Sequence, residues 1–103
     1  MSRAVAFGPS ALAELTEAID WYVARDPGLG TRLLAEVDAV VRRIAASPLQ
    51  FPPVMQDVRR ARLSHFPYSL FFRLDGNSAL VLACFHSSRN PSGLLERFNR
   101  STS

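Results

Sequence analysis

The spacing of apolar residues changes once along this chain, and the change divides it into a helical part and a strand part. From residue 9 to residue 46, apolar side chains recur at intervals of three and four, as on one face of a helix. From residue 58 to residue 86 they largely follow a period of two, as in a half-buried strand. A proline-rich connector, residues 49–53, separates the two parts. The pattern predicts an α+β fold.

The helical part predicts two helices rather than one. The first opens at Pro9, because proline suits the first turn of a helix, and it ends at the break formed by residues 26–28. The second covers about residues 29–46. Because the break is short, we expect the two helices to form an antiparallel hairpin. A short strand over residues 3–7 is expected before them.

Three antiparallel strands are expected in the second part, over residues 58–66, 68–75 and 78–86. The last two flank Gly76-Asn77, a strong signal for a two-residue hairpin turn. Residues 87–103 are polar and contain a short helix or a tail. The predicted order is β-α-α-β-β-β, with the helical hairpin packed on a mostly antiparallel sheet in one domain, 1–103.

A two-residue turn also fixes which hairpin side chains share a face. One face should receive the helices, because its cross-strand pairs are all apolar: Leu74 with Ala79, Phe72 with Val81, Leu70 with Ala83, and Tyr68 with Phe85. The other face carries Phe71, Arg73, Leu80 and Leu82, together with Ser69, Cys84 and His86. We expect Phe71, Arg73, Leu80 and Leu82 to form an exposed binding site for a partner. The alternative is that the C-terminal tail or a second copy covers this face.

Charge is distributed unevenly along the chain. The net charge is +3, and all 12 basic residues are arginine. Residues 1–58 hold five arginines and seven acids, whereas residues 59–103 hold seven arginines and two acids. The C-terminal half is therefore the expected face for an anionic partner. A single cysteine, no apolar run of signal-peptide form and no membrane-length segment predict a cytoplasmic protein.

Candidate chemistry is limited to histidine and arginine. His86 stands three residues before Arg89 and has the side chain for acid or base work near a phosphate, although a strand-end histidine also commonly bonds to the following loop. Arg60 and Arg62 have the planar fork that binds phosphates or carboxylates. No residue spacing indicates a metal site, and no glycine-rich phosphate loop is present, so no metal and no cofactor are predicted.

Several motifs, taken in order, resemble those of one known family. They are residues 18–22 (AIDWY), 47–48 (SP), 59–62 (RRAR), 66–74 (FPYSLFFRL) and 81–91 (VLACFHSSRNP). In this order they resemble the RelE/ParE superfamily of toxins from bacterial type II toxin–antitoxin systems. The resemblance implies a toxin that forms a hetero-oligomer with a cognate antitoxin. It also implies one of two targets: ParE-like members, associated with plasmid stabilization, inhibit DNA gyrase, whereas RelE-like members cleave mRNA on the ribosome.

Two departures favour the ParE-like branch. Ser69 stands where the ribonucleases commonly carry an arginine, and no tyrosine follows Tyr68 in the chain. The chain therefore lacks two groups that would hold a phosphate and stack on a base. If it were nonetheless an mRNA endonuclease, the resemblance implies basic roles for Arg60, Arg62 and Arg89, and His86 would be the candidate acid or base. A non-toxic relic that only binds its antitoxin is the third possibility.

Overall fold

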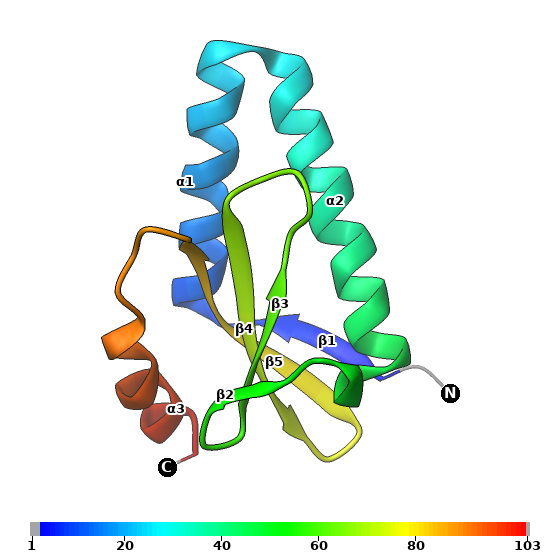
Figure 1. Cartoon of the computed structure of the whole chain (residues 1–103), viewed down its shortest axis with the longest axis vertical. Helices are drawn as coiled ribbons and strands as arrows, with labels where there is room; N and C mark the ends of the chain where they lie inside the picture. The colour runs from blue at the N-terminus through cyan, green and yellow to red at the C-terminus, as the bar shows by residue number, and fades with distance from the viewer. Residues whose placement is uncertain (1–2, 103) are drawn as a thin grey trace.

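The computed structural model describes residues 3–102 and confirms the α+β fold (Figure 1). The chain forms a strand, two long helices, four further strands and a short helix. These are β1 (Ala4–Phe7), α1 (Pro9–Arg25), α2 (Pro27–Ala46), β2 (Pro53–Met55), β3 (Val58–Arg62), β4 (Tyr68–Asp75), β5 (Ser78–His86) and α3 (Leu94–Thr102), with 3-10 turns at Pro48–Gln50 and Pro91–Gly93. β2, which lies between the predicted connector and the strand expected from residue 58, was not anticipated. In the described residues, no helix combines the length and apolar character needed to cross a membrane.

The helical hairpin turns more tightly than the sequence indicated. Only Asp26 separates α1 from α2, and its side chain accepts a hydrogen bond from the backbone N–H of Gly28 at 2.9 Å. This bond caps α2 and allows it to begin at Pro27. The helices then cross closely at Gly30, where an added Cβ would overlap the Val23 side chain. Glycine at this position permits the close crossing.

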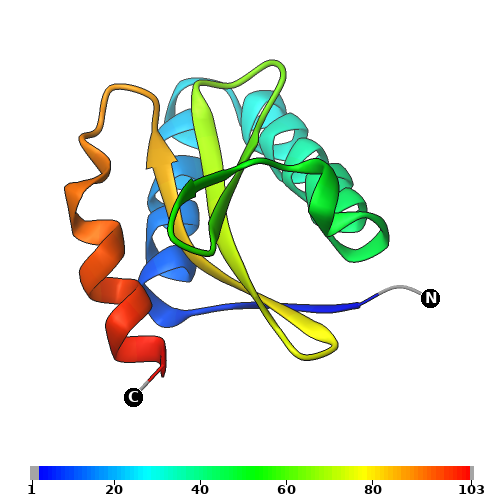
Figure 2. The ribbon, with the colours of Figure 1, turned by 60° about the horizontal axis from the view of Figure 1, so that its bottom comes forward.

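The five strands form one sheet in the order β1-β5-β4-β3-β2. β1 is parallel to β5 and the other neighbours are antiparallel. α1 and α2 cover one face, while α3 lies against the other (Figure 2). Apolar side chains of both helices and of the sheet form the main core between them, including Leu15, Leu33, Val37, Ile44, Leu70, Phe72 and Val81.

The predicted hairpin register is correct only near the turn. Leu74 pairs with Ala79 and Phe72 with Val81, but the register then shifts, so that Phe71 pairs with Ala83. Leu82 is thus the extra residue of a β-bulge in β5. The predicted pairs of Leu70 with Ala83 and of Tyr68 with Phe85 are therefore wrong: Leu70 pairs with Cys84, Ser69 with Phe85, and Tyr68 with His86.

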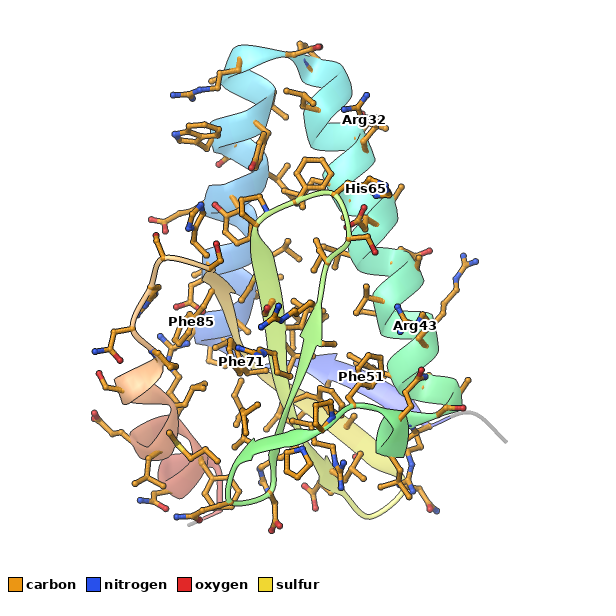
Figure 3. All side chains as sticks on the ribbon, in the orientation of Figure 1. Arg32, Arg43, Phe51, His65, Phe71 and Phe85 are labelled. Carbon is orange, nitrogen blue, oxygen red and sulfur yellow. The ribbon has the colours of Figure 1, made fainter. Side chains whose placement is uncertain are left out.

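The bulge also exchanges the faces at the end of β5. Ala83 and Phe85 lie on the face that carries α3, whereas Cys84 joins the core beneath the helical hairpin. Phe85 packs against Phe71 with ring centroids 5.5 Å apart (Figure 3). The prediction that Ala83 and Phe85 face α1 and α2 is therefore wrong, because one inserted residue reverses the alternation.

The second face of the sheet is covered rather than open. Leu94 of α3 is fully buried in a cluster that includes Val58, Phe71 and Leu82, and Phe98 packs against this cluster. Phe71 and Leu82 are each only 5% exposed to solvent, and Leu80 is partly buried. The expectation that Phe71 and Leu82 are exposed is therefore wrong, because the C-terminal helix buries these apolar side chains.

Candidate functional site

A basic hollow lies where β3, β4 and β5 meet the segment that leads to α3. This hollow, the arginine groove, has a volume of about 320 Å³ and is lined in part by Arg60, Arg62, Ser69, His86 and Arg89. The four residues that the nuclease alternative requires, Arg60, Arg62, His86 and Arg89, therefore surround one space. Whether they carry chemistry stays a prediction, and it depends on what their side chains contact.

His86 is bonded to the loop that follows it. Its Nδ1 accepts a hydrogen bond from the backbone N–H of Ser88 at 3.0 Å and lies 2.8 Å from the Ser88 hydroxyl. Because a backbone N–H can only donate, Nδ1 carries no proton, and the neutral ring holds its proton on Nε2. Tyr68 packs edge-on against the ring at 5.1 Å. In this arrangement Nδ1 is occupied and Nε2 is a donor, so the ring offers no free base.

Arg89 is also held by a contact within the chain. One guanidinium nitrogen donates to Glu14 at 2.8 Å, and the group lies 4.0 Å above the Phe85 ring. Arg60 and Arg62 differ, because neither has an ion-pair partner among the side chains that the structure describes. Their charges are therefore available to an anion that enters the groove.

The four residues predicted to bind a partner, which the family resemblance implies is an antitoxin, lie beneath or beside α3. Phe71 and Leu82 pack directly under it, and Leu80 packs against the same cluster. The Arg73 guanidinium lies 5.7 Å from the Phe98 ring centroid and 4.0 Å from the Asp75 carboxylate. Their role as antitoxin contacts stays a prediction, and direct contact with Phe71 or Leu82 requires α3 to move.

A second and larger hollow lies between α1 and the ends of β4 and β5. This acid–aromatic pocket has a volume of about 780 Å³. Its lining includes Glu17, Asp20, Trp21, Tyr22 and Tyr68, and it shares Tyr68, His86 and Arg89 with the arginine groove. The sequence analysis missed this pocket. The available signal was the spacing of Glu17, Asp20 and Trp21, which brings them together on one helix face.

Two side chains that line the pocket, Tyr68 and Cys84, have raised pKa values. Burial, followed by the charges of neighbouring groups including Glu17, raises the pKa of Tyr68. Burial, followed by the charge of Glu14, raises the pKa of Cys84 to about 12. Cys84 is therefore a protonated core thiol rather than a nucleophile. Among the described residues, no three His, Cys, Asp or Glu side chains come together as metal ligands.

Comparison with known proteins identifies the family. The family model for the ParE toxin of the type II toxin–antitoxin system parDE matches residues 5–91. Toxin ParE2 of Mycobacterium tuberculosis, in strains CDC 1551 and H37Rv, is 32% identical over 82 residues, which cover 79% of this chain and 78% of the relative.

Two solved structures share the fold. The chromosomal ParDE system of P. aeruginosa matches with a TM-score of 0.72 at 21% identity, covering 82% of this chain and 96% of that one. The toxin–antitoxin complex RelBE2 of Mycobacterium tuberculosis matches with a TM-score of 0.62 at 21% identity, covering 84% and 99%. The family-model match over residues 5–91 and the 32% identity to Toxin ParE2 show that the chain belongs to the ParE toxin family of type II toxin–antitoxin systems.

Proposed function

We propose that this ParE-family toxin is neutralised in the cytoplasm by a cognate antitoxin, and that the free toxin inhibits DNA gyrase without cleaving RNA. In this proposal residues 1–103 act as one toxin domain. The observation that carries the choice of target is the state of the arginine groove. Two of its four candidate catalytic groups, His86 and Arg89, are held by internal hydrogen bonds.

The chemistry of RNA cleavage explains why this matters. In-line cleavage needs one group to take the proton of the attacking 2′-hydroxyl and others to stabilise charge on the phosphate. Arg60 and Arg62 have the charge for the second task. No described residue of the groove is free to take the proton of the 2′-hydroxyl, because Nδ1 of His86 already accepts a hydrogen bond from the backbone N–H of Ser88. The groove is therefore better suited to binding an anion than to transferring a proton.

The known relatives support the antitoxin as partner. The relative from P. aeruginosa belongs to a ParDE system, and RelBE2 is a toxin–antitoxin complex. An antitoxin that reaches this chain meets unpaired Arg60 and Arg62, which fit carboxylate side chains. The expected product is a stable hetero-oligomer in which the toxin surface is no longer available to gyrase.

The RelE-like alternative, cleavage of mRNA on the ribosome, rests on a different observation. Arg60, Arg62, His86 and Arg89 line one groove, as a nuclease site would require. If ribosome binding displaced the Ser88 loop, Nδ1 of His86 would become accessible. The two functions differ in their dependence on Arg60 and Arg62. RNA cleavage requires their charge in the groove, whereas the proposed inhibition of gyrase does not depend on catalysis there.

A paired assay separates the two functions. Purified toxin is added to a DNA gyrase supercoiling assay and, separately, to translating ribosomes whose mRNA is mapped for cuts. We expect loss of supercoiling with intact mRNA. Cut mRNA that disappears in the R60A/R62A double variant, but not in R32A/R42A with the same charge loss on α2, would instead establish the endonuclease. Absence of both effects, together with normal growth on expression, would identify a non-toxic relic.

A further inference from the structure

The proposed function leaves the acid–aromatic pocket unused. Glu17 and Asp20 lie on its wall, both exposed, and neither has an ion-pair partner among the side chains that the structure describes. Glu14, one turn away, is different, because Arg89 and Arg97 both pair with it. The pocket therefore presents two uncompensated carboxylates on a chain whose net charge is +3.

Trp21, Tyr22 and Tyr68 form the aromatic part of the pocket lining. Trp21 remains 50% exposed, and Tyr22 packs edge-on against it with ring centroids 4.9 Å apart. The guanidinium of Arg25 already lies over the Trp21 ring, 3.3 Å from its centroid. Aromatic faces attract cations through their negative π-surface, and tryptophan does so most strongly. The chain itself thus shows that this ring engages a guanidinium group.

The carboxylates and aromatic rings of the pocket together indicate which kind of ligand it can bind. Carboxylates beside aromatic rings fit a cation with a flat face, and arginine satisfies both because its planar guanidinium pairs with carboxylates and stacks on rings. Lysine offers only a point charge. A volume of about 780 Å³ exceeds one side chain and suits a short peptide segment.

We propose that this pocket receives an arginine side chain of the antitoxin, with its guanidinium paired to Glu17 and Asp20 and packed against Trp21. This inference rests on the proposed neutralisation by an antitoxin. The pocket and the arginine groove share Tyr68, His86 and Arg89, so one antitoxin segment can reach both. Its arginine occupies the acid–aromatic pocket while its carboxylates pair with Arg60 and Arg62. This alternation of charge gives the antitoxin segment a defined register.

The pocket can be tested without the antitoxin, because Trp21 is the only tryptophan of the chain. N-acetyl-arginine amide is titrated into the toxin while tryptophan fluorescence is recorded, and the uncharged citrulline analogue serves as the ligand control. We expect saturable quenching by the arginine probe alone. In E17Q/D20N we expect its Kd to rise by about fivefold or more, because charge-assisted hydrogen bonds are lost. Equal Kd values for this variant and the wild type, or equal quenching by citrulline, would overturn the inference.

The matched protein control is D57N/D38N, which removes two carboxylates elsewhere on the surface and should leave the Kd unchanged. The second arm measures the affinity of the cognate antitoxin for the same three proteins. A weaker complex with E17Q/D20N alone supports the antitoxin as occupant, and equal affinities refute it. Failure of the antitoxin to bind even the wild type would refute the proposed function instead, while the arginine titration would still report on the pocket.

Discussion

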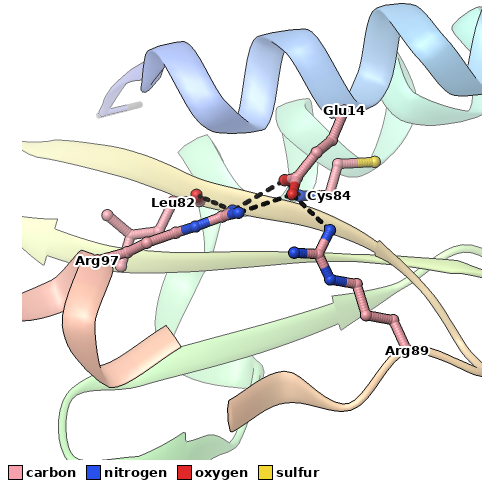
Figure 4. A network of polar contacts seen from close by, with 5 residues as sticks. All are labelled: Glu14, Leu82, Cys84, Arg89 and Arg97. Carbon is pink, nitrogen blue, oxygen red and sulfur yellow. Dashed lines mark hydrogen bonds and ion pairs between the residues drawn. The ribbon is translucent and has the colours of Figure 1, made fainter. Parts of the chain in front are cut away.

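The guanidinium of Arg97 in α3 binds both carboxylate oxygens of Glu14 in α1, at 2.9 and 2.8 Å, across 83 residues of sequence (Figure 4). The same two side chains also bond the backbone at the β5 bulge. Arg97 donates to the carbonyl oxygen of Leu82 at 3.1 Å, and Glu14 accepts from the N–H of Cys84 at 3.0 Å. Polar backbone groups beside the bulge are thus satisfied by the contact that fastens α3 to α1.

Arg97→Ala should therefore loosen α3 and destabilise the protein. The substitution removes two charge-assisted bonds to Glu14 and leaves the Leu82 carbonyl without that donor, at a cost of about 1–3 kcal/mol in the free energy of unfolding. Urea unfolding measures this cost, and hydrogen exchange should show faster exchange in α3. Arg42→Ala is the control, because its i,i+4 pair with Asp38 is exposed and should be worth less than about 0.5 kcal/mol. Equal losses in the two variants would show that the Glu14–Arg97 pair does not fasten α3.

Gly30→Ala should destabilise the helical hairpin, although alanine favours a helix over glycine by about 1 kcal/mol. The added methyl group would overlap Val23 at the crossing of α1 and α2, and overpacking of this kind costs about 1–3 kcal/mol. The overpacking cost less the gain in helix propensity leaves an expected net loss of up to about 2 kcal/mol in thermal or urea unfolding. Adding Val23→Ala should recover part of it. Gly93→Ala is the control, because nothing lies within 4 Å of the new Cβ, and it should be nearly neutral. A stabilised G30A would contradict the close crossing.

The parts of the fold that follow from local chemistry could be predicted from the sequence. Pro9 starts α1, and Gly76-Asn77 turns the hairpin as expected. The bulge at Leu82 could not be predicted, because Leu80 to Phe85 is an unbroken apolar run. Alternation reveals the faces of a strand only where one face is polar. Because α3 covers the second face, both faces of β5 are apolar. The sequence pattern therefore does not show which side chains of β5 lie on which face.

The candidate site was predictable to a similar degree. Arg60, Arg62 and Arg89 are indicated by family resemblance and His86 by its chemistry, and the structure brings all four to one groove. Their internal contacts could not be predicted, since the Arg89 bond to Glu14 spans 75 residues. The burial of Phe71 by α3 could not be predicted either, because it depends on how this short C-terminal helix packs against the sheet. Contacts between residues so far apart in the chain produce no recognisable spacing pattern in the sequence.

The contact between Glu36 and His65 should make stability depend on pH in the acid range. Burial acts to raise the pKa of Glu36, but hydrogen bonds from the backbone and ring of His65, with lesser contributions from Ser64 and from the charge of His65, outweigh it and hold the pKa below its ordinary value of 4.5. A depressed carboxylate pKa stabilises the fold above the unfolded-state value, and this contribution is lost as pH falls through the folded-state pKa.

Glu36→Gln should therefore be less stable than wild type at pH 7, by about 1 kcal/mol, and the difference should shrink below about pH 4.5. Urea unfolding of both proteins from pH 7 down to pH 3 measures it. Asp57→Asn is the control, because Asp57 is exposed and its carboxylate has no partner among the described side chains. A difference that stays constant with pH would show that the ionised carboxylate of Glu36 is not what stabilises the contact.

Cys84 should resist alkylation in the folded toxin. With a pKa of about 12 its thiolate fraction at pH 8 is about one in ten thousand, against roughly a quarter for an ordinary thiol of pKa about 8.5. Because only the thiolate attacks, iodoacetamide should react about a thousandfold more slowly than with the urea-unfolded chain, as followed by mass spectrometry. Folded and unfolded chains that react at equal rates would mean that α1 separates readily from β5. The acid–aromatic pocket requires that these two elements stay together, so rapid alkylation would also count against an arginine bound between them.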